Sequence, residues 1–341
     1  MTTDAGMDWY DVLEFGVEGR GWSDVAMPYD RLPARAEGVV REVIWNLSRS
    51  ACGMTARFST DATTIKARWR LRNAMLNEAN FPRAGFSGLD LYIRDGERWR
   101  FGGATTQFQS QDAEDNLAAD IPAQRRRCLV HLPLRNPVDT LEIGVPAGSV
   151  FEPEAPRTER PILYYGTSIV HGAYASRPGM VHTAILGRRL DRPMLNLGFS
   201  GNAQMEPEVA ALLAEQDPCL YVIDPLPNMN GPMVAERGEA FMRTLLEAHP
   251  TTPMVMVEDR TFTTAWLRPE KLAQHAASRA AYRTIYERLR GEGAPLTYVT
   301  AADQFGDDNE ASPDGSHPTD LGYMRMADRL EPALRQALGE H

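Results

Sequence analysis

The chain has 341 residues, of which 43% are hydrophobic and 24% are charged, and its formal net charge is −10. This composition is typical of a globular protein with room for two domains, and the negative charge disfavours nucleic acid as a partner. No window of 18 residues is apolar enough to span a membrane, and the first residues lack the basic start and apolar core of a signal peptide, so we expect a cytoplasmic protein without a membrane partner.

The segment between Val39 and Val150 predicts a series of short strands. Short strands at close intervals, without a helical period, are typical of an antiparallel sandwich or jelly roll. Asp95-Gly96 tolerates positive φ, so we expect a hairpin turn over residues 94–98. Seven runs rich in β-branched and aromatic residues carry this prediction: 39–47, 55–60, 64–71, 88–96, 98–103, 128–134 and 139–145.

Residues 151–161 interrupt this pattern with three prolines and several charges. Such a stretch marks a boundary between domains. We therefore predict an accessory all-β domain over residues 1–155 and a second domain over residues 156–341. Because the linker is short, we expect the sandwich to lie close to the second domain and to cover one side of its ligand cleft.

The second half alternates apolar strands with helices. We expect helices after Glu206-Pro207, over 270–290 and over 319–338, the last with a kink at Pro332. This alternation predicts a parallel sheet of about five strands that is buried on both faces. Ligands of such sheets bind at the carboxyl ends of the strands. The expected strands are 162–165, 194–197, 220–224, 254–259 and 296–300.

Three of the loops at this edge carry candidate groups for acyl chemistry. Ser168 follows the first strand in YYGTSIVHG, Gly201 follows the second in NLGFSGN, and Asn228 follows the third in DPLPNMN. A serine hydroxyl can act as a nucleophile, and a backbone N–H and a side-chain amide can bind an oxyanion. Each has a structural alternative, which is a helix cap, a flexible loop and an Asx-turn, respectively.

The fourth loop, SPDGSHPTD, places Asp314 three residues before His317. A serine needs a base to take its proton, and a carboxylate must hold that base in one tautomer. Of the seven histidines, only His317 has an acid nearby in a Gly/Pro loop before the last helix. His171 and His182 lack such a partner. The three widely spaced cysteines fit neither a disulfide framework nor a metal site.

The four loops together resemble the sequence blocks of the SGNH (GDSL-like) hydrolases. The matching motifs are GTSI, SGN, PNMN and DGSHP, over the segment from about Pro161 to the C-terminus. In the first half, GLDLY at 88–92 resembles the Gly-x-Asp-Leu-Tyr signature of a β-sandwich that precedes this hydrolase domain in one subgroup. The resemblance implies a flavodoxin-like three-layer α/β/α domain with about five parallel strands, preceded by an all-β sandwich.

The resemblance also implies roles for individual residues. Ser168 would be the nucleophile, His317 the general base and Asp314 the residue that orients it, without a metal or an organic cofactor. The oxyanion hole would combine the N–H groups of Ser168 and Gly201 with the side chain of Asn228. The residues next to Ser168 and next to Asn228 differ from the family pattern. We expect three further residues to contact the substrate: Thr167, Met229 and Arg177.

For Arg177 the alternative is a structural ion pair. The expected activity is removal of a small acyl group, such as acetyl, from a sugar or another small alcohol, so the expected partner is a small-molecule ester. One alternative is an acyltransferase with the same Ser-His-Asp site. Another is a non-catalytic carbohydrate-binding protein in which Trp45, Trp69 and Trp99 present aromatic platforms. The sequence leaves open the formation of a homo-oligomer.

Overall fold

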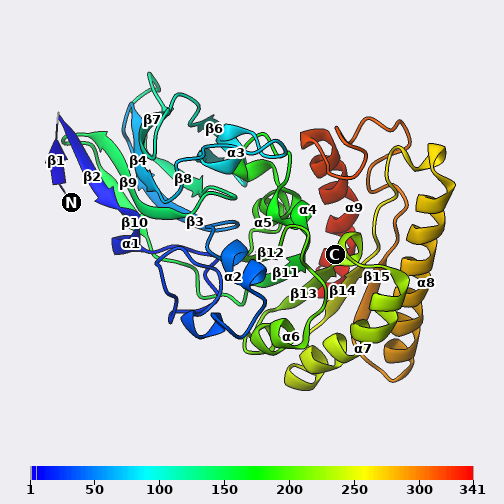
Figure 1. The fold of residues 1–341 in the computed structure, drawn as a ribbon. Coiled ribbons are helices and arrows are strands. Elements are labelled where there is room, and N and C mark those ends of the chain that lie inside the picture. Colours follow the sequence, from blue (N-terminus) through cyan, green and yellow to red (C-terminus); the bar gives the residue numbers. More distant parts are fainter. Residues whose placement is uncertain (1, 5, 341) are drawn as a thin grey trace.

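The computed structural model describes residues 2–4 and 6–340, and its strands form three sheets of five strands each (Figure 1). Two sheets are antiparallel and pack as a sandwich around one core. In spatial order, the first is β1 (Thr2–Asp4), β2 (Met7–Asp11), β9 (Val138–Pro146), β4 (Ile65–Leu71) and β7 (Asp112–Ala118). The second is β10 (Phe151–Glu154), β3 (Thr55–Thr60), β8 (Arg126–His131), β5 (Asp90–Asp95) and β6 (Arg98–Ala104).

The third sheet is parallel and confirms the predicted flavodoxin-like arrangement. Its order is β12-β11-β13-β14-β15, so the direction of winding switches beside β11, the first strand along the chain. Strands β11, β12 and β13 are buried along their whole length, which explains their largely apolar sequences. The bounds are β11 (Ile162–Gly166), β12 (Met194–Gly198), β13 (Leu220–Asp224), β14 (Met254–Val257) and β15 (Leu296–Val299).

Helices cover both faces of the parallel sheet (Figure 1). One face packs against α6 (Pro207–Ala214), α7 (Gly231–Ala248) and α8 (Pro269–Gly291). The other packs against α4 (Ser168–His171), α5 (His182–Leu190) and α9 (Asp320–Leu338), which continues through Pro332. Besides α2, described below, the remaining elements are α1 (Val12–Phe15), α3 (Arg83–Phe86) and four short 3₁₀ turns: η1 (Ala34–Ala36), η2 (Pro178–Met180), η3 (Leu226–Asn228) and η4 (Ala265–Leu267).

The strand predicted over residues 39–47 is wrong, because this segment forms helix α2 (Glu42–Ser48). Val40, Ile44 and Leu47 are buried at helical spacing, whereas Val43 is exposed. The sequence-based prediction relied on the β-branched composition of this segment and gave too little weight to the helical spacing of its buried residues. Strands β1, β2, β7 and β10 lie outside the seven predicted runs. The hairpin turn is confirmed, since β5 ends at Asp95 and β6 begins at Arg98.

Helix α2 belongs to the core of the parallel sheet. Trp22, Ile44 and Trp45 share a hydrophobic cluster with Leu163 of β11 and Leu197 of β12. On the opposite face, the sandwich contributes Phe81, Phe86 and Leu134 to the cluster that also contains residues of α4, α5 and α9. The first 150 residues therefore pack against both faces of the parallel sheet and fix the surroundings of its carboxyl edge.

Candidate active site

The carboxyl ends of strands β11, β12 and β13 lie level with one another. Gly166, the last residue of β11, pairs with Gly198 in β12 and with Asp224 in β13. The loops that follow these strands therefore leave the same edge of the sheet, as the prediction requires. They carry Ser168, Gly201 and Asn228.

Ser168 is the first residue of the short helix α4. The hydroxyl of Thr167, the residue before it, accepts a hydrogen bond from the Ile169 N–H at 3.3 Å and so caps the helix. Thr167 is completely buried, whereas Ser168 keeps 8% of its surface exposed. The turn thus presents the serine, and not the threonine, at the edge of the sheet.

His317 reaches Ser168 from the loop before α9. Its Nε2 lies 2.7 Å from Ser168 Oγ, and its Nδ1 lies 2.7 Å from Asp314 Oδ2. An ionised carboxylate accepts a hydrogen bond from Nδ1–H, which leaves the Nε2 lone pair to accept a hydrogen bond from the Ser168 hydroxyl. The three side chains therefore form one continuous hydrogen-bonded chain across 149 positions of sequence.

Asp314 is held in its ionised form by its own loop. Partial burial alone would raise the pKa of this carboxyl. Hydrogen bonds from the backbone N–H groups of His317, at 2.8 Å, and Ser316, at 2.9 Å, together with the His317 ring, outweigh burial and bring the pKa below its ordinary value. The carboxylate can therefore orient the imidazole over a broad range of pH.

Asn228 and Gly201 are the other two groups expected at this edge. The Asn228 Oδ1 atom accepts a hydrogen bond from the Ala203 N–H at 3.1 Å. This contact fixes the orientation of the amide and leaves its nitrogen without a hydrogen-bond partner among the described residues. Gly201 is exposed and has a φ of 70°, a conformation that glycine adopts without strain. Both groups can thus offer N–H donors to an oxyanion.

The family model of the GDSL-like lipases and acylhydrolases matches residues 159–335, which is more than half of the chain. The chain belongs to this family. A second family model, which describes the N-terminus of SGNH-hydrolase-type esterases and carries the GxDLY motif, matches residues 7–151. A comparison with curated proteins found no significant match.

Solved structures resemble this GDSL-like hydrolase over its whole length. A protein described as a GDSL-like lipase from Bacteroides ovatus ATCC 8483 is 29% identical, with a TM-score of 0.92 and 98% of each chain covered. The salicylyl-acyltransferase SsfX3 from a tetracycline biosynthetic pathway is 18% identical, with a TM-score of 0.71 over 99% of this chain and 96% of that one. A family two carbohydrate esterase from Cellvibrio japonicus is 16% identical, with a TM-score of 0.64 and 98% of each chain covered.

Family membership and fold together identify this protein as a carboxylic ester hydrolase.

Two of the three residues expected to contact the substrate are buried in the interior of this hydrolase. Thr167 is the buried helix cap described above, and Met229 is 5% exposed and belongs to the core beside η3. Met229 therefore packs beneath the loop that carries Asn228.

Arg177, the third such residue, forms the structural ion pair. Its Nη1 donates to Asp90 Oδ2 at 2.8 Å and to the Tyr92 hydroxyl at 2.6 Å. Asp90 also accepts the Gly179 N–H at 2.8 Å. Asp90 and Tyr92 are the aspartate and tyrosine of the GLDLY motif, so this motif binds the sandwich to η2, the turn that follows the serine helix.

The histidines ranked below His317 are both buried. His171 lies between Ser50 Oγ, 3.0 Å from its Nε2, and Ser200 Oγ, 3.2 Å from its Nδ1. His182 stacks on Tyr323 with ring centroids 5.7 Å apart. Neither has a carboxylate within 4 Å among the described residues, which separates both from His317.

Sequence reasoning missed residues that brace the site from the first half of the chain. Arg31 is fully buried and donates to the carbonyl groups of Asn196 and Gly198 at the end of β12. Arg41 Nη1 donates to Asn202 Oδ1 at 2.9 Å, next to Gly201. No local pattern marks these two arginines, because these partners lie more than 160 residues away.

Tyr174 was also missed. Its ring centroid lies 5.9 Å from that of His317, and its N–H donates to the Asn80 carbonyl of the sandwich at 2.8 Å. Its φ of 65° is unusual for an aromatic residue and holds the ring in this place. A sandwich loop therefore reaches the histidine side of the site through Tyr174.

Among residues 2–4 and 6–340, no three or more His, Cys, Asp or Glu side chains are grouped so that they would hold a metal ion. None of the helices in the same residues combines the length and hydropathy needed to cross a membrane.

Proposed function

We propose that this protein hydrolyses small carboxylic esters, acetyl esters of sugars or other small alcohols above all, through an acyl-enzyme on Ser168. The hydrogen-bonded chain from Ser168 through His317 to Asp314 is the observation that carries this proposal. A serine hydroxyl at 2.7 Å from an imidazole nitrogen is placed to lose its proton to that nitrogen as it attacks a carbonyl.

In the first half-reaction, Ser168 Oγ attacks the ester carbonyl carbon while its proton moves to His317 Nε2. The oxyanion that forms accepts hydrogen bonds from the Ser168 N–H, the Gly201 N–H and the Asn228 amide. His317 then protonates the leaving alcohol oxygen as its bond to the carbonyl carbon breaks. In the second half-reaction, His317 takes a proton from water, whose oxygen attacks the acyl-enzyme, and Ser168 recovers its proton as the acid leaves.

A small acyl group fits the recessed position of the serine. Ser168 is 8% exposed, and the Tyr174 ring stands on its histidine side. Proteins of the same fold include a family two carbohydrate esterase from Cellvibrio japonicus and an acetyl xylan esterase from Butyrivibrio proteoclasticus. Their names supply the analogy for an acetylated sugar as substrate, and the contact between Asn80 and Tyr174 supports a sandwich loop as one wall of the cleft.

An acyltransferase would use the same acyl-enzyme and differs only in the acceptor, which is an alcohol in place of water. The similarity of the fold to that of the salicylyl-acyltransferase SsfX3 keeps this as the second candidate. Product analysis separates the two, because a transferase gives a new ester when a competing alcohol is added. Of the three tryptophans that the non-catalytic alternative would use, Trp45 and Trp69 are core residues with 4% and 2% exposure, and Trp99 is half-buried.

The proposal is tested with p-nitrophenyl esters of increasing acyl length and with acetylated sugars. We expect acetate to be the best acyl group, Ser168→Ala to lower kcat/KM by at least about 1,000-fold, and an organophosphonate to label the wild type but not Ser168→Ala. Ser110→Ala, at an exposed serine of the sandwich, is the matched control and should behave as the wild type. Full activity or full labelling of Ser168→Ala would refute the role of this serine.

A further inference from the structure

The β-turn that carries Gly201 can take two arrangements. Residues 199–202 form this turn, and the Asn202 N–H closes it on the Phe199 carbonyl at 2.9 Å. Gly201 is the third residue, and its φ of 70° is that of a type II turn. In a type I turn the central peptide, between Ser200 and Gly201, is turned over by about 180°. Glycine adopts both forms without strain, so contacts from outside the turn must select one.

This choice decides where the Gly201 N–H points. The Ser200 carbonyl and the Gly201 N–H belong to one trans peptide and therefore point in opposite directions. The Gly201 N–H has no acceptor among the described residues, so it is free to bind a ligand. In the type I form the carbonyl oxygen would take the place of this donor and would repel an oxyanion instead of binding it.

The side chain of Asn202 holds the peptide in the observed form. Its Nδ2 donates to the Ser200 carbonyl oxygen at 2.7 Å. Turning the peptide over would break this hydrogen bond, because the carbonyl would then point away from the amide. The contact lies on the side of the peptide opposite to the Gly201 N–H, so it leaves the space in front of that donor open to an oxyanion.

Arg41, from the first half of the chain, sets the orientation of the Asn202 amide. Its Nη1 donates to Asn202 Oδ1 at 2.9 Å, and its Nη2 donates to the Asn202 carbonyl at 3.1 Å. A guanidinium can only donate, so the amide oxygen faces Arg41 and the amide nitrogen faces Ser200. Glu206, which is 8% exposed, accepts a hydrogen bond from Arg41 Nε at 2.7 Å and holds the guanidinium in place.

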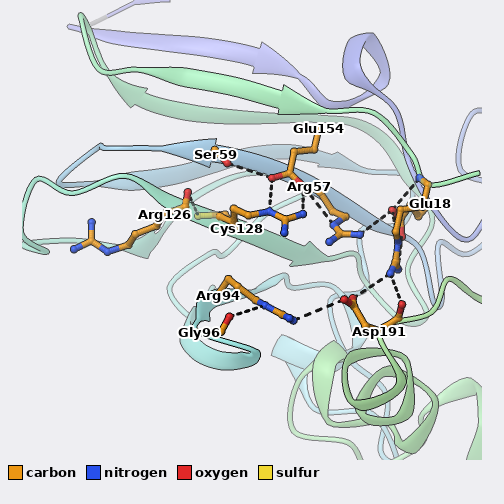
Figure 2. Close-up of polar contacts among 11 residues, drawn as sticks. Glu18, Arg57, Ser59, Arg94, Gly96, Arg126, Cys128, Glu154 and Asp191 are labelled. Atoms are coloured by element: carbon orange, nitrogen blue, oxygen red, sulfur yellow. Dashed lines mark hydrogen bonds and ion pairs between the residues drawn. The ribbon is translucent and has the colours of Figure 1, made fainter. Parts of the chain in front are cut away.

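The first half of the chain is itself fixed against the parallel sheet. Arg41 directly precedes α2, whose buried face belongs to the core of the sheet. Beyond the other end of β12, Arg157 pairs with Glu18 at 2.8 Å and with Asp191 at 3.2 Å. Figure 2 shows Glu18 beside Arg57 on the sandwich side of this network and Asp191 on the other side. The first half therefore presents Arg41 to the turn as a rigid group.

We propose that Asn202 is a positioning residue of the oxyanion hole, which holds the Ser200–Gly201 peptide so that the Gly201 N–H faces the reacting carbonyl oxygen. Arg41 acts through Asn202 by fixing its amide. This inference rests on the proposed hydrolytic function. The oxyanion needs the donor more than the bound ester does, so the effect of Asn202 falls on kcat and not on KM.

Steady-state kinetics with p-nitrophenyl acetate test this proposal with two substitutions of Asn202. Asn202→Asp keeps the size of the side chain and the contact with Arg41, but its carboxylate cannot donate to the Ser200 carbonyl. We expect Asn202→Asp and Asn202→Ala each to lower kcat by at least about tenfold, with KM changed less than about threefold. A residue that only held Arg41 would tolerate Asn202→Asp, so an unchanged kcat in this variant would overturn the proposal.

The rate of labelling by an organophosphonate supplies a second measurement. The tetrahedral adduct on Ser168 places an oxygen in the same hole, so the labelling rate should fall in parallel with kcat. An undiminished labelling rate in Asn202→Asp would overturn the proposal. A wild type that neither hydrolyses esters nor reacts would refute the proposed function and this inference with it, whereas an active wild type matched by Asn202→Asp refutes this inference alone.

Arg41→Met tests the link to the first half and keeps the test decisive if an Asn202 variant folds poorly. We expect it to lower kcat by at least about fivefold, and to add nothing to Asn202→Ala in the double variant, because Arg41 acts through Asn202. Arg157→Met is the matched control: it also removes an arginine between the halves, and Arg57 stays beside Glu18. It should keep the wild-type kcat. Equal losses in Arg41→Met and Arg157→Met, or additive losses in the double variant, would overturn the proposal.

Discussion

Replacing Arg177 by methionine tests how firmly the GLDLY motif joins the sandwich to the loop behind Ser168. The Asp90 carboxylate is fully buried, and Arg177 is its ion-pair partner at 2.8 Å. Methionine keeps much of the aliphatic stem but removes the charge, so the carboxylate retains only the Gly179 N–H as a donor among the described residues. Breaking a fully buried ion pair costs about 3–5 kcal/mol. Because the Arg177 side chain is 18% exposed, we expect a loss of about 2–3 kcal/mol at pH 7.

The loss depends on pH, and its sign follows from Asp90. Burial raises the pKa of Asp90 above its ordinary value, and Arg177 opposes that rise. Without Arg177 the pKa in the folded protein rises further, so the folded variant binds a proton that the unfolded chain releases above a pKa of about 3.9. Between these two pKa values, stability falls as the pH rises. The deficit of the variant is therefore full near neutral pH and shrinks as the pH falls toward about 4.

Urea unfolding followed by circular dichroism at pH 7 and at mildly acidic pH measures this effect as a difference from the wild type. The double variant Asp90→Asn/Arg177→Met is the internal control, because a neutral amide needs no cation and should recover more than half of the deficit. Arg325→Met controls for the loss of a partly exposed, ion-paired arginine and should not change the midpoint. A deficit of equal size at both pH values, or a double variant no more stable than Arg177→Met, would refute the reasoning.

Three further outcomes are expected. Asn228→Ala should lower kcat for p-nitrophenyl acetate by about 100- to 1,000-fold with little change in KM, because it removes one oxyanion donor; a change confined to KM would contradict that role. Asp314→Asn should lower kcat by about 100- to 10,000-fold, since an amide cannot hold the His317 tautomer; steady-state kinetics with less than a threefold change would speak against it. Gly179→Ala should destabilise the protein by about 1–3 kcal/mol, because its Cβ would lie 2.5 Å from Tyr92 Cε2. In urea unfolding, Gly291→Ala, which meets no atom within 4 Å, should be neutral, and equal losses in the two variants would count against the crowding at Gly179.

The parallel sheet and its loops follow from local sequence. Strands β11, β12 and β13 are largely apolar because helices cover both faces of the sheet, and the residues after them mark where each strand ends. Asp314 and His317 are three residues apart on one loop, so their hydrogen bond is also a local property. The approach of His317 to Ser168 is long-range, and the prediction needed the common edge of a parallel sheet to bring the two loops together.

Contacts between the two halves of the chain do not follow from local sequence. Helix α2 was assigned as a strand because composition alone does not show which part of the protein a segment packs against. The helix packs against the core of the parallel sheet, whose first strand begins over 100 residues later. Arg31 and Arg41 likewise act through backbone and side-chain acceptors in the second half. The burial of Arg31 depends on that packing, and an isolated arginine in a polar stretch carries no sign of it.

The GLDLY motif explains why the sandwich accompanies this hydrolase fold. Asp90 binds both Arg177 and Gly179, and Arg188 binds the Gly179 carbonyl at 2.7 Å, so η2 is held from both sides at a position ten residues after the serine. Phe81 and Phe86 of the sandwich share a core with Ile169 of the serine helix. A polypeptide that begins after residue 150 would expose these apolar surfaces and leave Arg177 without its carboxylate. The sandwich is therefore best regarded as part of the framework that holds Ser168 in place, and its effect on catalysis must be read from point substitutions at Asp90 and Arg177 within the intact chain.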